Sequence, residues 1–298
     1  FCRIGPGEER TLTSSESPIV LLDRNGATGI APSVAPGNPA LGIMLPYTPL
    51  HAILMHLLKV PVVATSGNRS DEPMCIDERD ALERLGGIAD LFLVHDRPIV
   101  RHVDDSVVRW MASRELVIRR ARGFAPLPVL LPSPVRHPML CLGAHQKSVV
   151  ARVVGDQASL SQHIGDLDTY EARAAFQRVA DDLTDLYPSS EPSSVVCDLH
   201  PEYASTIEAR RRSTTPILVQ HHHAHAAACR AENRLEGPAL AVTWDGTGLG
   251  TDGTIWGGEF FVGEGVDMRR IATLLSFPLL GGGKVARPDP PSRIYTRV

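Results

Sequence analysis

The chain has 298 residues, 43% of them hydrophobic and 21% charged, which is the balance of a globular protein large enough for two cores of ordinary size. Its formal net charge of -4 provides no broad basic field, so binding to nucleic acid is not expected. No apolar run reaches the roughly 18 to 20 residues of a membrane span, and five scattered cysteines without CxxC spacing argue against a disulfide framework or a zinc ribbon, so a reducing, cytoplasmic location away from membranes is expected.

The first part of the chain alternates between apolar, β-branched runs and helical patterns. Helices are predicted at residues 50–59, where leucines and an isoleucine share one face, and at residues 76–85, behind Asp77 and Glu78. Strands are predicted at residues 19–22, 60–64, 91–94 and 107–111. This alternation predicts an α/β domain over residues 1–122.

A proline-rich stretch marks the predicted domain boundary. Five prolines between residues 123 and 138 exclude a helix and disfavour a central strand, so this stretch is predicted to be a linker. A second α/β domain is predicted over residues 139–298. Its predicted strands are residues 139–143, 149–154, 195–199, 217–219 and 239–244, and its predicted helices are residues 168–187 and about 221–233.

Both ends of the chain have the character of internal sequence. Residue 1 is Phe, and residues 287–291 are too rich in proline to finish a core strand or helix. The chain is therefore predicted to be a piece of a longer protein.

Four histidines within residues 221–225 carry the strongest chemical signal. His221 and His225 have the i, i+4 spacing of one helix face, so two imidazoles can bind one metal ion. Asp245, at the end of the strand predicted at residues 239–244, is the natural oxygen ligand. The pattern predicts one divalent metal ion and leaves iron and zinc open. The alternative is a polar helix start with histidines by chance.

Glycines after the same strand suggest a phosphate-binding turn over residues 245–253. Gly246 and Gly248 would let backbone amides approach a phosphate without a clash from a Cβ atom. A plain hairpin turn explains the glycines equally well when they are taken alone. The histidine helix that precedes the strand favours the ligand site.

In the first domain, Thr65, Ser66 and Asn68 follow the strand predicted at residues 60–64, and α/β folds bind ligands at the carboxyl ends of strands. An ordinary polar turn is an equally good explanation. Residues 95–106 concentrate charge beside a predicted strand. Charged segments of this kind more commonly form solvated loops than binding sites.

Taken together, these motifs resemble the HypF carbamoyltransferases of nickel-iron hydrogenase maturation. The first region is similar to the YrdC-like domain of that family, and the second to its threonylcarbamoyl-transferase-like domain, which has an actin-like ATPase fold. The resemblance covers about residues 17–280. The motifs that carry it are residues 45–51, 65–68, 95–99, 104–107, 161–167, 198–203, 221–225, 245–248 and 256–259.

The resemblance implies two successive reactions. The YrdC-like domain joins carbamate, released from carbamoyl phosphate, to ATP with its Mg²⁺ and forms carbamoyl adenylate. The second domain passes the carbamoyl group to the C-terminal cysteine of the partner HypE, where it becomes a cyanide ligand of the hydrogenase iron. Catalytic residues are not assigned. The implied adenylate or nucleotide site comprises Thr65, Ser66, Asn68, Arg101, Ser106, Lys147, Gly246 and Gly248, and the implied metal ligands are His221, His225 and Asp245.

Departures from the family pattern leave other interpretations open. The sequence contains neither an acylphosphatase domain nor CxxC-type zinc motifs, and it leaves the family pattern after Gly283, so the chain is expected to be incomplete as an enzyme. The tRNA threonylcarbamoylation proteins and small-molecule O-carbamoyltransferases use the same two modules, but the YrdC-like module in front on one chain favours HypF. A noncatalytic nucleotide-binding fragment is the remaining alternative.

Overall fold

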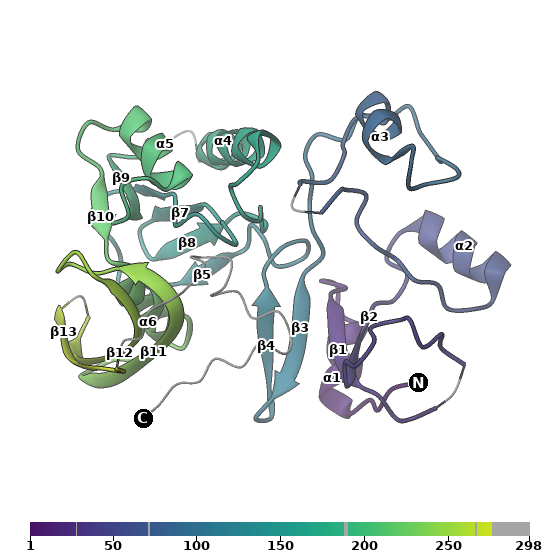
Figure 1. Cartoon of the computed structure of the whole chain (residues 1–298), viewed down its shortest axis with the longest axis horizontal. Coiled ribbons are helices and arrows are strands. Elements are labelled where there is room, and N and C mark those ends of the chain that lie inside the picture. Colours follow the sequence, from purple (N-terminus) through teal and green to yellow (C-terminus); the bar gives the residue numbers. More distant parts are fainter. Residues whose placement is uncertain (28, 71, 188–189, 266, 276–298) are drawn as a thin grey trace. The chain divides into compact units, whose positions relative to one another are not determined.

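The computed structural model describes residues 1–27, 29–70, 72–187, 190–265 and 267–275, and the proline-rich residues 287–291 lie outside this part of the chain. Contacts divide the chain into two compact units, Phe1–Leu127 with Ser161–Ala175 and Pro128–Leu160 with Phe176–Val298. The division falls inside helix α4 (Tyr170–Asp185). Figure 1 shows the helices and strands of each unit, which confirm the predicted α/β class.

The first unit is built on a four-stranded mixed sheet with the order β2-β1-β3-β4. Strand β1 pairs antiparallel with β2 and parallel with β3, and β3 pairs antiparallel with β4. Alternate residues of a strand face the same side, so Val20 and Leu22 are buried together, and Leu12 of the first helix packs against them. The elements are α1 (Pro6–Leu12), β1 (Ile19–Asp23), β2 (Ala40–Ile43), β3 (Val107–Met111) and β4 (Arg114–Arg119).

Two further helices of this unit begin where the sequence provides caps. Helix α2 (Pro49–Leu58) follows Thr48, whose hydroxyl accepts a hydrogen bond from the backbone of its first turn. Helix α3 (Glu78–Leu85) follows Asp77, whose carboxylate accepts two backbone N–H groups. Both helices lie where the sequence pattern predicted them.

Two predicted strands of this unit are wrong. Residues 60–64 and 91–94 carry apolar, β-branched side chains, but among the described residues neither segment pairs with a strand. Their side chains are exposed, Leu91 by 91%, except that of Phe92, which is half-buried. Strand propensity reflects packing on a half-buried sheet surface, and without a neighbouring strand it produces no sheet. Thr65 therefore follows an irregular segment and not a strand end.

The second unit contains a six-stranded mixed sheet with the order β10-β9-β6-β7-β8-β5. Strands β6, β9 and β10 are parallel, and β7, β8 and β5 continue the sheet in antiparallel pairs. Strand β5, from the stretch predicted as a linker, lies at the edge, where a proline is tolerated. The elements are β5 (Pro128–Leu130), β6 (Met139–Cys141), β7 (Ala151–Val154), β8 (Gln157–Leu160), β9 (Ser194–Asp198), β10 (Ile217–Val219) and helix α5 (Ala204–Arg212).

A three-stranded antiparallel sheet completes the second unit, made of β11 (Ala239–Leu249), β12 (Ile255–Glu264) and β13 (Asp267–Thr273). Helix α6 (His221–Glu232) lies against this sheet (Figure 1). Between them the side chains of Ala226, Trp256, Phe261 and Met268 form a buried cluster. The burial of this cluster fixes the helix on the sheet.

Strand β11 is longer than predicted. It continues past Trp244 through a bulge to Leu249, so the predicted turn over residues 245–253 is wrong in its first half. The chain reverses later, where Gly250 N donates to Thr254 O at 2.8 Å. A bulge admits extra residues without ending the pairing, and the sequence signal of glycines does not distinguish it from a turn.

The buried cluster predicts unequal effects for two neighbouring phenylalanines. Phe261 is completely buried, so Phe261→Ala should lower the free energy of unfolding by about 3–5 kcal/mol in urea denaturation. Phe260, the preceding residue of β12, is only half-buried, and Phe260→Ala is the matched control with a smaller expected loss. Equal losses would contradict this assignment of the core.

Candidate metal centre

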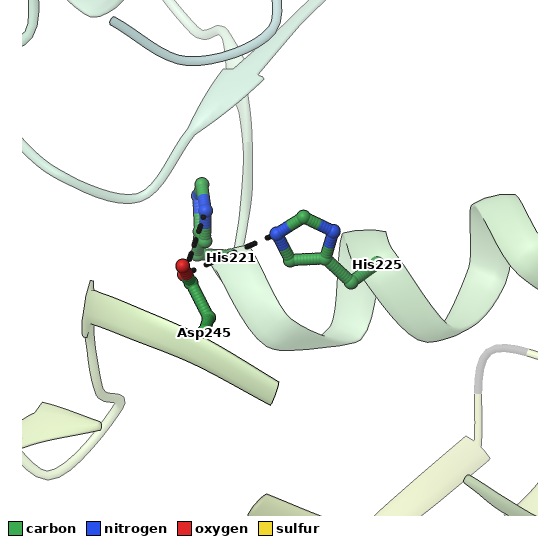
Figure 2. A group of neighbouring side chains, drawn as sticks. All are labelled: His221, His225 and Asp245. Carbon is green, nitrogen blue, oxygen red and sulfur yellow. Dashed lines mark ion pairs between the residues drawn. The ribbon is translucent and has the colours of Figure 1, made fainter. Parts of the chain in front are cut away.

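Two elements of the second unit position the three predicted metal ligands. Helix α6 begins at His221 because the side-chain Oε1 of Gln220 accepts a hydrogen bond from His223 N at 3.0 Å. One helical turn then places His225 beside His221. Asp245 reaches them from the bulge of β11, and Figure 2 shows both imidazoles facing its carboxylate.

The three side chains converge on one point. One ligand atom from each of His221, His225 and Asp245 lies within 4.8 Å of the other two. Asp245 Oδ2 is 3.1 Å from His221 Nε2 and 3.9 Å from His225 Nε2. This oxygen is buried and accepts no hydrogen bond, whereas Oδ1 of the same carboxylate accepts one from Gly246 N at 2.7 Å. A buried carboxylate oxygen that faces two imidazoles and accepts no hydrogen bond fits a divalent metal ion.

Sequence reasoning missed Asp198 as part of this site. Asp198 is the last residue of β9, its side chain is 4% exposed, and its Oδ2 lies 2.6 Å from His221 Nδ1. Its Oδ1 accepts a hydrogen bond from His200 N at 2.8 Å. A carboxylate on the far nitrogen of a metal-binding histidine fixes the tautomer and the orientation of the ring. The signal available in the sequence was a carboxylate within the otherwise apolar strand predicted at residues 195–199.

The charges around the site make the two predicted histidine ligands different. Interaction with Asp198 first, and with Asp245 second, raises the pKa of His221 to about 9. Burial, reinforced by the charge of His221, lowers the pKa of His225. Burial raises the pKa of Asp245, but the contact with His221 outweighs it and the net shift is downward. Near neutral pH the metal-free site therefore holds one histidine cation between two carboxylates, and the second histidine is neutral.

Gly248 allows β11 to approach the start of α6. A Cβ atom at this position would lie 2.6 Å from His222 Cε1 and 3.0 Å from His221 Cβ, closer than side chains tolerate. Gly248 is buried, whereas Gly246 is exposed in the same strand. Gly248 is thus needed for the contact between strand and helix that brings Asp245 to the histidines.

The loop that contains the predicted adenylate-binding residues of the first unit is held by hydrogen bonds from its own side chains. Thr65 and Ser66 are exposed, and Asn68 Nδ2 donates to the carbonyl of Glu72 at 3.0 Å. Arg84 of α3 forms an ion pair with the Glu72 carboxylate at 2.7 Å. Arg84 thus helps to hold the loop through Glu72. Sequence reasoning missed this residue because the ion pair joins a helix to a loop.

The remaining predicted nucleotide-binding residues have different surroundings. Ser106 is completely buried, and its Oγ donates to Arg122 O at 2.9 Å and accepts from Ala121 N at 2.8 Å. Its hydroxyl is committed to the backbone of the first unit. Arg101, in the first unit, and Lys147, in the second, are exposed.

None of the described helices is long and apolar enough to cross a membrane.

Three family models match successive parts of the chain. Residues 1–121 match the Sua5, YciO and YrdC model, described as telomere recombination. Residues 134–232 match the HypF Kae1-like domain, and residues 241–296 match the second subdomain of the carbamoyltransferase Kae1-like domain. The chain is therefore of the class in which a YrdC-like part precedes a Kae1-like part.

Relatives narrow this class to one family. The chain is 48% identical to carbamoyltransferase HypF of Synechocystis sp., over 92% of this chain and 36% of the relative. It is 41% identical to carbamoyltransferase HypF2 of Cupriavidus necator, over 95% of this chain and 38% of the relative. It matches a crystal structure of full-length HypF in the phosphate- and nucleotide-bound form with a TM-score of 0.85 at 43% identity, over 91% of this chain and 36% of that chain. It matches the crystal structure of T. kodakarensis HypF with a TM-score of 0.88 at 34% identity, over 96% and 38%. The chain belongs to the HypF carbamoyltransferase family and spans somewhat more than a third of the length of these relatives.

Metal binding should release a proton. In the metal-free site His221 Nε2 faces a carboxylate, and a metal ion can bind this nitrogen only after its proton has left. Because the pKa of His221 is about 9, the apparent affinity for Zn²⁺ should rise by about tenfold per pH unit near neutral pH. Calorimetric titrations in buffers of different ionisation enthalpy count the released protons. Proton-independent binding would contradict the assignment of His221 as a ligand.

The same pKa predicts how the metal-free protein loses stability with pH. The folded-state pKa of His221, about 9, exceeds the ordinary value of 6.5, so its stabilising contribution is complete below pH 6.5 and is lost as the pH rises through 9. Thermal unfolding with a chelator should show a falling Tm over this interval. Asp198→Asn removes the main cause of the shift and should flatten the dependence, and an unchanged slope in this variant would refute the explanation.

Proposed function

We propose that this chain supplies the carbamoyl-adenylate-forming unit and part of the carbamoyl-transfer unit of a HypF carbamoyltransferase that uses carbamoyl phosphate and ATP. The observation that carries the proposal is the convergence of His221, His225 and Asp245 in a chain of this family. The family-model matches over residues 1–121, 134–232 and 241–296 support two domains, proposed at residues 1–122 and 139–298. Within the proposed linker at residues 123–138, Pro128–Leu130 form β5 of the second unit's sheet.

In the first unit, a carbamate oxygen attacks the α-phosphorus of Mg²⁺-bound ATP, a new O–P bond forms, and pyrophosphate leaves. Carbamate is a poor electrophile because its charge and resonance disfavour attack, whereas the mixed anhydride with AMP has a good leaving group. Thr65, Ser66 and Arg101 are exposed, and their hydroxyls and cation would contact the phosphates. Asn68 and Ser106 shape the surrounding backbone through the hydrogen bonds that they make.

In the second unit, the carbamoyl group passes to the C-terminal cysteine of HypE. The thiolate attacks the carbamoyl carbon, the C–S bond forms, the C–O bond to AMP breaks, and AMP leaves. His221, His225 and Asp245 would hold one divalent ion, iron or zinc, which supplies positive charge next to the nucleotide when it is bound. The side chain of His225 is 56% exposed, so the site is open to a ligand on that side. The exposed Lys147 is proposed to contact the same nucleotide. Gly246, whose amide donates to Asp245, and Gly248, which packs against His222, are proposed to shape the backbone around it.

Exchange of labelled pyrophosphate into ATP, with ammonium carbamate as the source of carbamate, tests the first reaction. A version of the chain extended at both ends should catalyse carbamate-dependent exchange, and the double substitution Thr65→Ala with Ser66→Ala should reduce it by at least about tenfold, because it removes two donors to the phosphates. An extended protein that binds ATP without any carbamate-dependent exchange would contradict the proposal and favour a noncatalytic binding module.

The two reactions should respond to different substitutions. In the extended protein, His225→Ala should leave pyrophosphate exchange unchanged, because this ligand belongs to the second unit. The same substitution should abolish carbamoylation of HypE, read by mass spectrometry of its C-terminal peptide. His137→Ala, at an exposed histidine outside the cluster, is the matched control and should affect neither reaction. Parallel loss of both reactions in His225→Ala would contradict the division of labour.

A further inference from the structure

The adjacent histidines 221 and 222 have opposite hydrogen-bond environments, and this contrast carries an inference that rests on the proposed metal centre. His221 Nδ1 lies 2.6 Å from Asp198 Oδ2. A carboxylate oxygen only accepts, so this ring nitrogen carries a proton. The other ring nitrogen, Nε2, is thereby left to face Asp245, and it is the atom that can bind a metal ion.

Gln220 imposes the reverse arrangement on His222. Its Oε1 accepts from His223 N at 3.0 Å, which fixes the orientation of the amide. Its Nε2 donates to Leu249 O at 3.1 Å and lies 3.1 Å from His222 Nδ1. An amide NH₂ group only donates, so His222 Nδ1 accepts and the proton of the neutral ring is on Nε2. This nitrogen cannot bind a metal ion in that form.

The Nε2–H group of His222 lacks a hydrogen-bond partner among the described residues, although the side chain is completely buried. It lies 3.9 Å from Asp245 Oδ2, a buried oxygen that forms an ion pair with His221 Nε2 at 3.1 Å but accepts no hydrogen bond. Buried donors and acceptors are rarely left unpaired, because each loses its hydrogen bonds to water. A small rotation of the carboxylate would bring this donor and this acceptor into hydrogen-bond range.

We propose that His222 is a positioning residue that donates its Nε2–H to the Asp245 carboxylate and holds this carboxylate toward the metal ion. The neighbouring His221 contributes an unprotonated Nε2 as a ligand, so the two histidines act in opposite tautomers. Carboxylates that bind metal ions are commonly oriented by such hydrogen bonds. Gly246 N on Oδ1 and His222 on Oδ2 then fix both oxygens of Asp245.

The packing around His222 supports this role. The absence of a side chain at Gly248 leaves room for the ring, since a Cβ atom there would lie 2.6 Å from His222 Cε1. The ring also lies 6.1 Å from that of Trp256, a member of the buried cluster between α6 and the sheet. The donor is thus held in place by strand, helix and core together.

Long-range ¹H–¹⁵N spectra of the histidine rings of the Zn²⁺-loaded chain test the tautomers directly. His222 should appear as the neutral ring protonated at Nε2, and His221 as the ring protonated at Nδ1. A His222 ring protonated at Nδ1 would overturn the proposal. Gln220→Glu keeps an acceptor for His223 N but replaces the donor to His222, and it should move the His222 proton to Nδ1.

Competition for Zn²⁺ with a chromophoric chelator tests the effect on the metal ion. Methionine and glutamine are close to each other in size, but only glutamine keeps an N–H donor, so His222→Met should weaken Zn²⁺ binding by about 10- to 100-fold and His222→Gln should restore most of the affinity. His223→Met, at the next residue of α6, is the matched control and should leave the affinity unchanged. Circular dichroism checks that each variant is folded.

The outcomes separate this inference from the metal centre on which it rests. Unchanged affinity in a folded His222→Met variant would overturn the inference alone. Equal weakening by methionine and glutamine would assign His222 to packing and would also overturn it. Failure of the unsubstituted chain to bind Zn²⁺, or full binding by His221→Ala and His225→Ala, would overturn the metal centre and the inference together.

Discussion

The close approach of α6 to β11 is the constraint on which the candidate site depends. Two histidines on one helix turn provide only part of a metal site, and the carboxylate comes from a strand on the far side of a loop. The buried cluster around Trp256 and Phe261 holds the two elements together, and Gly248 lets their backbones come close. Hydrophobic packing and the absence of a side chain at Gly248 therefore set the geometry of a polar site.

Electrostatics then distinguishes side chains that look equivalent in the sequence. Asp198 and Asp245 on either side of His221 stabilise its cation, whereas partial desolvation and the neighbouring charge of His221 lower the pKa of His225. A metal ion would replace the proton that now balances the two carboxylates, so the site is already arranged for positive charge. The same pair of carboxylates links metal affinity, proton release and the pH dependence of stability.

The two units have different kinds of candidate site. The site of the second unit is built on a helix start and a sheet strand, with its ligands held by neighbouring buried groups. The loop around Asn68 in the first unit is held by hydrogen bonds within the loop and by Arg84 of α3. Sites on packed elements hold their geometry more tightly than sites on loops, so the side chains of the metal centre are the more precisely positioned of the two sets.

Elements with strong local signals could be predicted from the sequence alone. Thr48 and Asp77 cap the helices that follow them, and the spacing of His221 and His225 places both on one helix face, because caps and helical periodicity act over a few residues. The strands predicted at residues 60–64 and 91–94 failed, since a strand also requires a partner that local sequence does not specify.

The residues that complete the site are brought together by long-range packing, which the sequence does not reveal. Asp198 precedes the histidine helix by many residues and reaches His221 because β9 ends there. The opposite roles of His221 and His222 follow from Asp198 on one ring and Gln220 on the other, which no spacing in the sequence reveals. Proton positions depend on contacts made through space, and such contacts exist only once the strands and the helix have packed.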